Sequence, residues 1–265
     1  MKASLGGGKG PRGGKLSMRL PAGIRPPGAG WLSANARRAE GRGSATFSGL
    51  AIHGGVMTPT AFRPAYTVQT EHTVLRCWSP ADAPLALRAI EANLEHLLPW
   101  MEWAKRYPMN VAQQAGQMRR MRGLFDLGQD FAYGVFNRDG SEVLGGTGLH
   151  PRVGEGALEI GYWISAGHTG RGIATEVAGA LTRVAFEVEG VRRVEIHCDP
   201  RNVRSAAVAR RLGFVLEGTL RQRLVAPDGV LRDTMVWTLL ADEYPASRAA
   251  ATPVEAFDVL GQKLL

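Results

Sequence analysis

The sequence has no long apolar run and only two cysteines. Because no stretch of about 18 consecutive apolar residues occurs, we expect no transmembrane helix. The chain does not begin with the charged and then apolar segment of a signal peptide, so we expect a cytoplasmic protein without a membrane partner. Cys77 and Cys198 are too few for a disulfide scaffold and lack the spacing of a metal or redox site. We therefore predict two buried thiols and no bound metal.

Acidic residues are nearly missing from the first 56 residues, which hold nine Lys or Arg and only Glu40. This segment is rich in Gly, Pro and Arg and has no hydrophobic periodicity, so it buries too little apolar area to offset its ordering entropy. We predict a disordered basic tail over 1–56 and a linker over 57–72. Three alternatives stay open for the tail: nucleic-acid or anion binding, a targeting peptide, or a misassigned start with Met57 as the true first residue.

From residue 73 on, the hydrophobic patterns predict one folded domain over 73–243. Alternation predicts strands at 73–78, 131–136, 143–149, 157–164, 191–198, 214–224 and 231–240. Helical spacing predicts helices from 80 to 98, at 111–127, from Gly172 onward and at 205–212. This order of elements predicts a mixed α/β sheet with helices on both faces. We expect 244–265 to form a peripheral C-terminal tail.

The run SAGHTGRGIAT at 165–175 follows an apolar strand-like segment and opens an apolar-periodic helix. N–H groups at a helix start have no intrahelical partner, and the helix dipole places partial positive charge there. Gly170 and Gly172 let the backbone approach an anion closely. The run therefore predicts a site for the pyrophosphate of a cofactor. A nucleotide-hydrolysing phosphate loop is disfavoured because G-x-x-x-x-G-K-[ST] is absent.

The segment 145–240 resembles the GNAT superfamily of N-acetyltransferases, and within it the ribosomal-protein N-terminal acetyltransferase (Rim-type) branch. The matching motifs are GGTGLHP (145–151), LEIGYWI (158–164), GRGIATE (170–176), DPRNVRSAAVARRLGF (199–214), EGTLR (217–221), and the pair Asp233 and Trp237. The resemblance implies a mostly antiparallel, seven-stranded α/β (α+β) sheet with a central splay between two parallel strands, 158–164 and 192–198. It also implies direct transfer of an acetyl group from acetyl-CoA to a primary amine, without a covalent enzyme intermediate.

The resemblance also assigns cofactor-binding residues. The family's pyrophosphate loop, Gln/Arg-x-x-Gly-x-Gly/Ala, falls here on Thr169, Gly170, Arg171, Gly172, Ile173 and Ala174. Thr169 departs from that pattern. Backbone N–H groups of the preceding strand, at Trp163 and Ile164, are expected to hold the thioester carbonyl, where such donors stabilise the oxyanion. Asn202 is expected to contact the cofactor arm and Ser205 to hydrogen-bond the CoA sulfur, although Ser205 is equally expected as the N-cap of its helix.

The base that takes the proton of the amine stays open at this point. Glu159, beside the cofactor strand, is the first choice, with Asp233 and Glu217 as rivals and a bound water as a further route. Tyr162 and His150 are weaker candidates for acid or base roles, since an aromatic residue in an apolar strand is more often part of the core.

Other residues near the motifs have two interpretations each. Trp100 and Trp103 are expected to pack in the core, with lining of an acceptor groove as the alternative. We expect His168 to be exposed in its turn. Arg171 and Arg204 are the favoured contacts to the CoA phosphates, with a solvated helix face as the alternative for all the nearby arginines.

The expected acceptor is a protein N-terminal α-amine of ribosomal-protein type. An α-amine, with a reference pKa of about 7.7–8.0, loses its proton far more readily than lysine at about 10.4, so a weakly placed base suffices. The first alternative is a small-molecule amine such as an antibiotic, polyamine or amino acid. The second is a non-catalytic acetyl-CoA sensor. Nucleic acid is expected as a partner only through the basic tail, and a monomer and a homodimer both fit the sequence.

Overall fold

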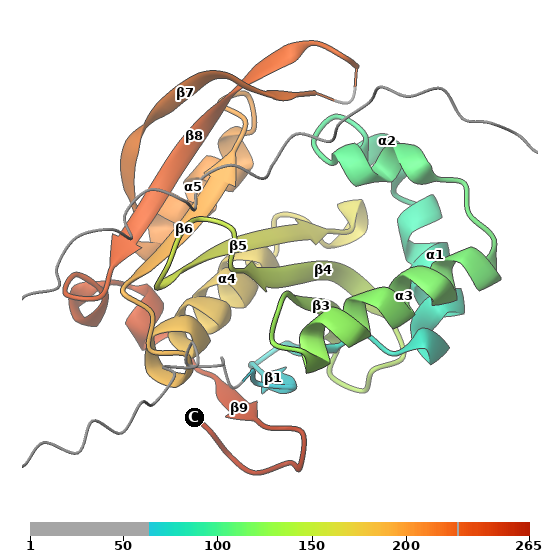
Figure 1. Ribbon diagram of the computed structural model, residues 1–265, viewed down its shortest axis with the longest axis horizontal. Coiled ribbons are helices and arrows are strands. Elements are labelled where there is room, and N and C mark those ends of the chain that lie inside the picture. Colours follow the sequence, from blue (N-terminus) through green and yellow to red (C-terminus); the bar gives the residue numbers. More distant parts are fainter. Residues whose placement is uncertain (1–63, 227) are drawn as a thin grey trace, which may run out of the picture. The chain divides into compact units, whose positions relative to one another are not determined.

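The computed structural model describes residues 64–226 and 228–265, so the predicted basic tail and residues 57–63 of the predicted linker lie outside the described residues. Nine strands of the described chain form one sheet in the order β7-β8-β6-β5-β4-β3-β2-β1-β9 (Figure 1). Their bounds are β1 (Thr67–Gln69), β2 (Thr73–Cys77), β3 (Phe131–Asn137), β4 (Val143–His150), β5 (Ala157–Ile164), β6 (Arg193–Cys198), β7 (Val215–Val225), β8 (Leu231–Leu240) and β9 (Glu255–Phe257).

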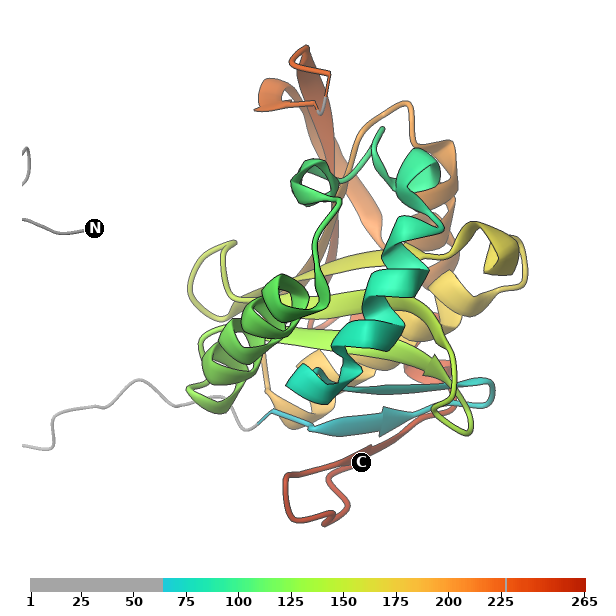
Figure 2. The same ribbon diagram turned by 90° about the vertical axis from the view of Figure 1, so that its right-hand side faces the viewer.

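Helices cover both faces of this sheet, as the order of elements predicts. Helices α1 and α3 lie over one face, and α4 and α5 lie over the other (Figures 1 and 2). The α-helices of the described residues are α1 (Ala83–Glu91), α2 (Leu94–Leu97), α3 (Val111–Asp126), α4 (Ile173–Arg183) and α5 (Val203–Leu212). None of the helices in the described ranges is long and apolar enough to cross a bilayer.

Local sequence signals set where the helices begin and end. Asn110 caps α3, because its side chain accepts the N–H of Gln113 at 2.9 Å while the Gln113 side chain accepts the N–H of Asn110. Gly213, at φ +97°, ends α5 in the left-handed conformation that glycine adopts at low cost. The predicted apolar face of α4 is confirmed, since Val177 and Leu181 are fully buried.

The core has two main layers, one on each face of the sheet. The larger cluster lies under α4 and α5 and includes Leu158, Ile160, Val177, Leu181 and Ala209. A smaller cluster lies under α1 and α3 and includes Trp78, Ala86, Met118 and Phe136. Burial of both faces explains why the central strands β3 and β4 are apolar along nearly their whole length.

The one parallel ladder of the sheet, between β5 and β6, is only three residues long. It pairs Ala157 with Arg193, Leu158 with Val194 and Glu159 with Glu195. Beyond these pairs the two strands diverge, while β6 continues its antiparallel pairing with β8 as far as Cys198. The predicted mixed sheet with a splay between two parallel strands is therefore confirmed, and the splay opens at Glu159.

The sheet has nine strands where we expected seven. The two additional strands are β1, inside the predicted linker, and β9, inside the predicted peripheral tail, and they pair antiparallel with each other. Each is only three residues long, so neither produces an alternating pattern that a sequence search can detect. Ala249 and Ala256 from the same C-terminal segment are fully buried in the main core. Residues 244–265 therefore contribute to the fold instead of lying outside it.

Candidate active site

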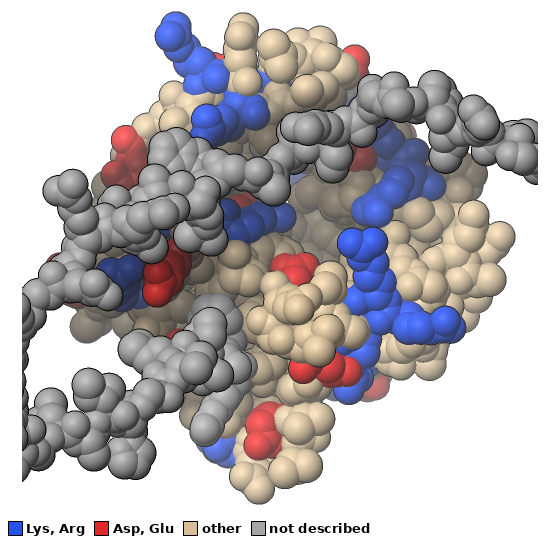
Figure 3. All heavy atoms as spheres, in the orientation of Figure 1, with Lys and Arg blue, Asp and Glu red and all other residues tan. Residues whose placement is uncertain are grey.

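A cleft of about 1700 Å³ lies at the splay between β5 and β6. Its lining comes from β5, the loop 165–172, the first turns of α4 and α5, the segment from α2 to the 3-10 helix η2 (Glu102–Arg106), and the β7–β8 hairpin. Figure 3 shows Lys and Arg side chains around the hollowed part of this face. Segments far apart in the chain thus meet at the point where the sheet opens.

The loop before α4 has the conformation that an anion site needs. Gly170 and Gly172 have φ values of +77° and +85°, which non-glycine residues rarely adopt. Gly172 is the N-cap of α4 and supplies no capping side chain, so the first N–H groups of the helix have no intrahelical acceptor. Gly172, Ile173 and Ala174 all line the cleft. Their N–H groups and the helix dipole can together bind a pyrophosphate.

The two polar residues of this loop, Thr169 and Arg171, contribute less to the anion site than its glycines do. Thr169 uses both its N–H and its hydroxyl within the turn, donating to the carbonyl of Ala166 at 3.2 and 2.9 Å. Donors for an anion therefore begin at Gly170. The side chain of Arg171 is exposed and is not among the residues that line the cleft, so its backbone is the part that belongs to the loop.

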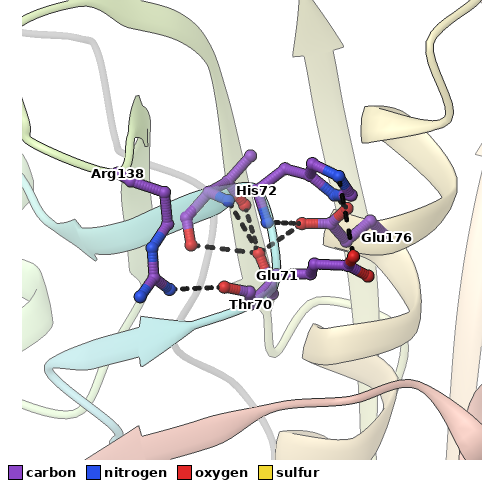
Figure 4. Close-up of polar contacts among 6 residues, drawn as sticks. Thr70, Glu71, His72, Arg138 and Glu176 are labelled. Carbon is purple, nitrogen blue, oxygen red and sulfur yellow. Dashed lines mark hydrogen bonds and ion pairs between the residues drawn. The ribbon is translucent and has the colours of Figure 1, made fainter.

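Glu176 lies in the first turn of α4, and the turn between β1 and β2 binds its carboxylate (Figure 4). The hydroxyl of Thr70 donates to it, and so do the N–H of His72 at 3.0 Å and the ring Nδ1 of His72 at 2.7 Å. Burial alone would raise the pKa of Glu176, but the hydrogen bonds from Thr70 and His72 lower it on balance. The turn between β1 and β2 is thereby tied to the helix that carries the loop.

Ser205 and Tyr162 face each other across the splay. The Tyr162 hydroxyl of β5 lies 3.0 Å from the Ser205 hydroxyl of α5. Burial raises the pKa of Tyr162, so both groups keep their protons and can donate hydrogen bonds. Asn202 is the N-cap of α5, and its Oδ1 accepts the N–H of Ser205 at 3.1 Å. The expectation that Ser205 is the N-cap was therefore wrong, and its hydroxyl is available to the cleft.

Glu159 forms an ion pair on the face of the sheet opposite to Tyr162. It is buried, and Arg152 donates to both of its oxygens at 2.7 Å. Burial raises the pKa of Glu159, but the two bonds from Arg152 lower it on balance. His197 of β6 lies beside this pair, with Nδ1 at 3.7 Å from Glu159 and Nε2 at 2.6 Å from Glu195. With both oxygens bound to Arg152, Glu159 is a weak proton acceptor.

The two rival carboxylates lie away from the cleft. Asp233 accepts the N–H of Gln222 at 2.8 Å within the β7–β8 hairpin, and Glu217 is exposed on β7. Neither is among the cleft-lining residues. His150 does line the cleft, and its Nδ1 lies 2.5 Å from Asp130. No sequence pattern marks Arg152 and Asp130 as partners of Glu159 and His150, because the register between strands brings them together.

Aromatic side chains gather where the cleft meets α2 and η2. Trp100 and Trp103 line the cleft, and the rings of Trp103 and Trp163 lie 6.1 Å apart. Trp163 lies across Gly146, where a Cβ atom would stand 2.5 Å from the indole nitrogen. His168, expected to be exposed, is half-buried, and its Nδ1 is buried without a hydrogen-bond partner. The 3-10 helix η3 (Ala166–His168) turns its ring toward the cleft.

The arginines near the cofactor elements have different environments. Arg201 and Arg204 line the cleft, and Arg201 is paired with Asp199 at 2.7 Å. Arg211 also lines it and donates to the hydroxyl of Thr175 at 2.9 Å. Arg210 lies over the Trp237 ring at 5.4 Å and does not line the cleft. Of Arg171 and Arg204, the two arginines expected to contact the CoA phosphates, Arg204 lines the cleft and Arg171 does not.

The described residues contain neither a disulfide nor a cluster of metal-ligating side chains. Cys77 and Cys198 are free and buried, as predicted. Burial raises the pKa of both thiols, so both stay protonated near neutral pH. No group of three or more His, Cys, Asp or Glu residues in the described ranges could hold a metal ion.

Known proteins match this chain over the same segments. A family model described as Acetyltransferase (GNAT) domain matches residues 72–215. The chain is 30% identical over 180 residues to the putative ribosomal N-acetyltransferase YdaF of Bacillus subtilis (strain 168), and the match covers 67% of this chain and 96% of that protein. It is 25% identical over 190 residues to the [Ribosomal protein uS5]-alanine N-acetyltransferase of Escherichia coli (strain K12), covering 70% and 96%. The structure of Mycobacterium smegmatis RimJ in complex with CoA-disulfide is similar at a TM-score of 0.63 and 28% identity, covering 70% of this chain and 92% of that one.

Proposed function

We propose that this chain, which belongs to the GNAT family of N-acetyltransferases, acetylates the N-terminal α-amine of a ribosomal protein. Its donor is acetyl-CoA, which a solved structure of the same fold holds. The names of two relatives at 25–30% identity refer to ribosomal proteins and support this acceptor. A ribosomal acceptor would also place the enzyme in the cytoplasm.

The donor is proposed to lie along the splay. The N–H groups from Gly170 to Ala174 bind the pyrophosphate, and Asn202 contacts the arm that leads from it. The backbone of Trp163 and Ile164, on the edge of β5 that β6 leaves unpaired, faces the thioester. A donor aimed at the thioester oxygen stabilises the negative charge that develops on it when an amine attacks.

Ser205 is proposed to assist the departing sulfur. As the C–N bond forms and the C–S bond breaks, the sulfur gains negative charge. The hydroxyl of Ser205, itself 3.0 Å from that of Tyr162, can donate a hydrogen bond to this sulfur. Glu159 keeps a place in the site, but as the partner that positions Arg152 over the acceptor end instead of as the base.

The extension of the cleft beyond the donor loop is the observation that carries the choice of acceptor. At about 1700 Å³ the cleft exceeds the roughly 300–1,000 Å³ of a site for one small ligand, so it has room for an acceptor beside the donor. Beyond the splay it continues between Trp100, Trp103 and the β7–β8 hairpin, where Arg232 donates to the carbonyl of Trp100 at 3.2 Å. The Arg232 Nε is buried without a partner and lines the same space, as a group that can bind a peptide carbonyl.

The test is an acceptor panel with purified protein and acetyl-CoA. It contains peptides with a free Ala, Ser or Met at the N-terminus, the same peptides with a blocked N-terminus and one internal lysine, and small amines. We expect tandem mass spectrometry to find one acetyl group on the free α-amine and none on the blocked peptides. Acetylation of small amines alone would overturn the acceptor, and binding of acetyl-CoA without any turnover would favour a sensor.

A further inference from the structure

We propose that His150, held by Asp130, is the base that takes the proton of the attacking amine. This inference rests on the proposed acetyl transfer, but it holds for any amine acceptor. His150 is the last residue of β4, and its Nδ1 lies 2.5 Å from the Asp130 carboxylate, just before β3. A carboxylate accepts the hydrogen of Nδ1, which leaves the lone pair of the neutral imidazole on Nε2.

Strand register places Nε2 at the opening of the splay. His150 pairs with Glu159 across β4 and β5, at the last residue where β5 still pairs with β6. The Nε2 atom lies 3.3 Å from the position that a Cβ of Gly161 would take, on the first residues of β5 beyond that point. Trp163 and Ile164, proposed to face the thioester, follow two and three residues further along β5. We therefore expect a nucleophile that attacks there to approach this nitrogen.

Glycines make room for the imidazole ring. A Cβ atom at Gly148 would stand 2.6 Å from both Cε1 and Nε2 of His150, closer than real Cβ contacts. Gly148 and Gly161 pair with each other across β4 and β5, so the ring packs against two neighbouring residues without side chains. Together with the bond to Asp130, this packing fixes the direction in which Nε2 points.

The neighbouring titratable groups are already engaged. Arg152 occupies both oxygens of Glu159, and His197 has a carboxylate next to each ring nitrogen, Glu195 at 2.6 Å and Glu159 at 3.7 Å. Three charged groups lie close to His150 on its own side of the sheet: Asp130, Arg152 and Glu159. Glu195 and Arg193 of β6 lie further away, beyond His197.

In the proposed step the amine attacks the thioester and His150 takes its proton. The amine nitrogen forms its bond to the acetyl carbon and passes a proton to Nε2, while the C–S bond breaks and the thiolate leaves with help from Ser205. The Asp130 carboxylate stabilises the imidazolium and stays unprotonated, as a positioning residue. The imidazolium then returns its proton to solvent.

The test compares His150→Gln and Asp130→Asn with the wild type, using whichever amine the wild type acetylates. His150→Gln should lower kcat about 10²-fold to 10³-fold, as removal of a general base does, while calorimetry finds unchanged acetyl-CoA affinity. The limb of the wild-type pH–rate profile that belongs to the histidine should vanish, and added imidazole should restore part of kcat. Asp130→Asn should lower kcat less and displace that limb.

His72→Gln, in the β1–β2 turn and outside the cleft lining, controls for removal of an exposed histidine and should keep the shape of the wild-type profile. The proposal fails if His150→Gln keeps kcat within about threefold with an unchanged pH profile, or if imidazole restores nothing. If His150→Gln does not fold, the pH–rate profile of Asp130→Asn is the test, and an unchanged profile overturns the proposal. Turnover of small amines alone would overturn the protein acceptor and leave this test intact, whereas a wild type that acetylates no amine contradicts both proposals.

Discussion

The proposed donor side and the proposed acceptor side of the cleft are built in different ways. On the donor side, consecutive residues of one loop and one helix start present backbone N–H groups, and two glycines at positive φ fix their direction. On the acceptor side, side chains from β4, β5, β6 and the loops beside them meet in pairs such as His150 with Asp130. The first arrangement is local in sequence, and the second exists only in the folded sheet.

This difference has a chemical consequence. A site made of backbone groups accepts the constant part of a reaction, the CoA pyrophosphate, whatever side chains surround it. A site made of side chains can change with single substitutions, which suits the choice of an acceptor. Variants of the two sides should therefore fail in different measurements.

The largest effect on acetyl-CoA binding should come from the donor backbone. Gly172→Val forces a β-branched residue toward φ +85°, a strain of about 1–3 kcal/mol, so calorimetry should find acetyl-CoA binding weakened about tenfold to a hundredfold. Gly140→Val is the matched control, because Gly140 has φ +74° and open space but lies in the β3–β4 turn, away from the cleft. Equal loss of affinity in both variants would show that the loop has no special role.

A smaller effect is expected where the two sides meet. Ser205→Ala removes the hydroxyl that we propose to assist the departing sulfur, so kcat should fall about tenfold while acetyl-CoA affinity changes little. Tyr162→Phe removes the partner hydroxyl, and the double variant should lose less than the product of the two single losses, because the groups act as one bonded pair. Steady-state kinetics of the three variants check this, and fully multiplicative losses would contradict it.

The acceptor side should respond through KM. Trp103→Ala removes an aromatic wall beside Trp163, so the KM for a peptide acceptor should rise several-fold, within the roughly 1 kcal/mol of an aromatic contact, with acetyl-CoA affinity unchanged. Leu127→Ala, at a residue 71% exposed, serves as the control for an apolar truncation. A loss of acetyl-CoA affinity in Trp103→Ala would contradict the division between the two sides.

The smallest effect concerns the tether of β1 to α4. The pKa of Glu176 is lowered, so its contribution to stability is present above its unfolded pKa of about 4.5 and is lost as the pH falls through the folded value. The pKa of His72 is raised by its bond to Glu176, so its contribution is present below about 6.5 and is lost at higher pH. Urea unfolding of wild type and Glu176→Gln should therefore differ most between about pH 4.5 and 6.5. A constant difference from pH 4 to pH 8 would exclude this ion pair.

The two sides of the cleft differ in how far the sequence predicts them, for a physical reason. The loop over 169–174, the splay and Ser205 follow from local patterns and a family motif. Two side-chain pairs depend on the register between strands: Glu159 with Arg152, and His150 with Asp130. A single sequence does not reveal that register. Strands β1 and β9, three residues each, are too short to show periodicity, and only the turn η3 decides that His168 faces inward.

Intact mass spectrometry of enzyme and peptide during turnover tests direct acetyl transfer most directly. With acetyl-CoA and a peptide that has a free N-terminus, we predict that the peptide gains one acetyl group on its α-amine. The enzyme, whose two cysteines are buried with raised pKa values, should keep its unmodified mass throughout. An acetylated enzyme that forms and decays as the product appears, or a peptide that never gains the group, would contradict this prediction.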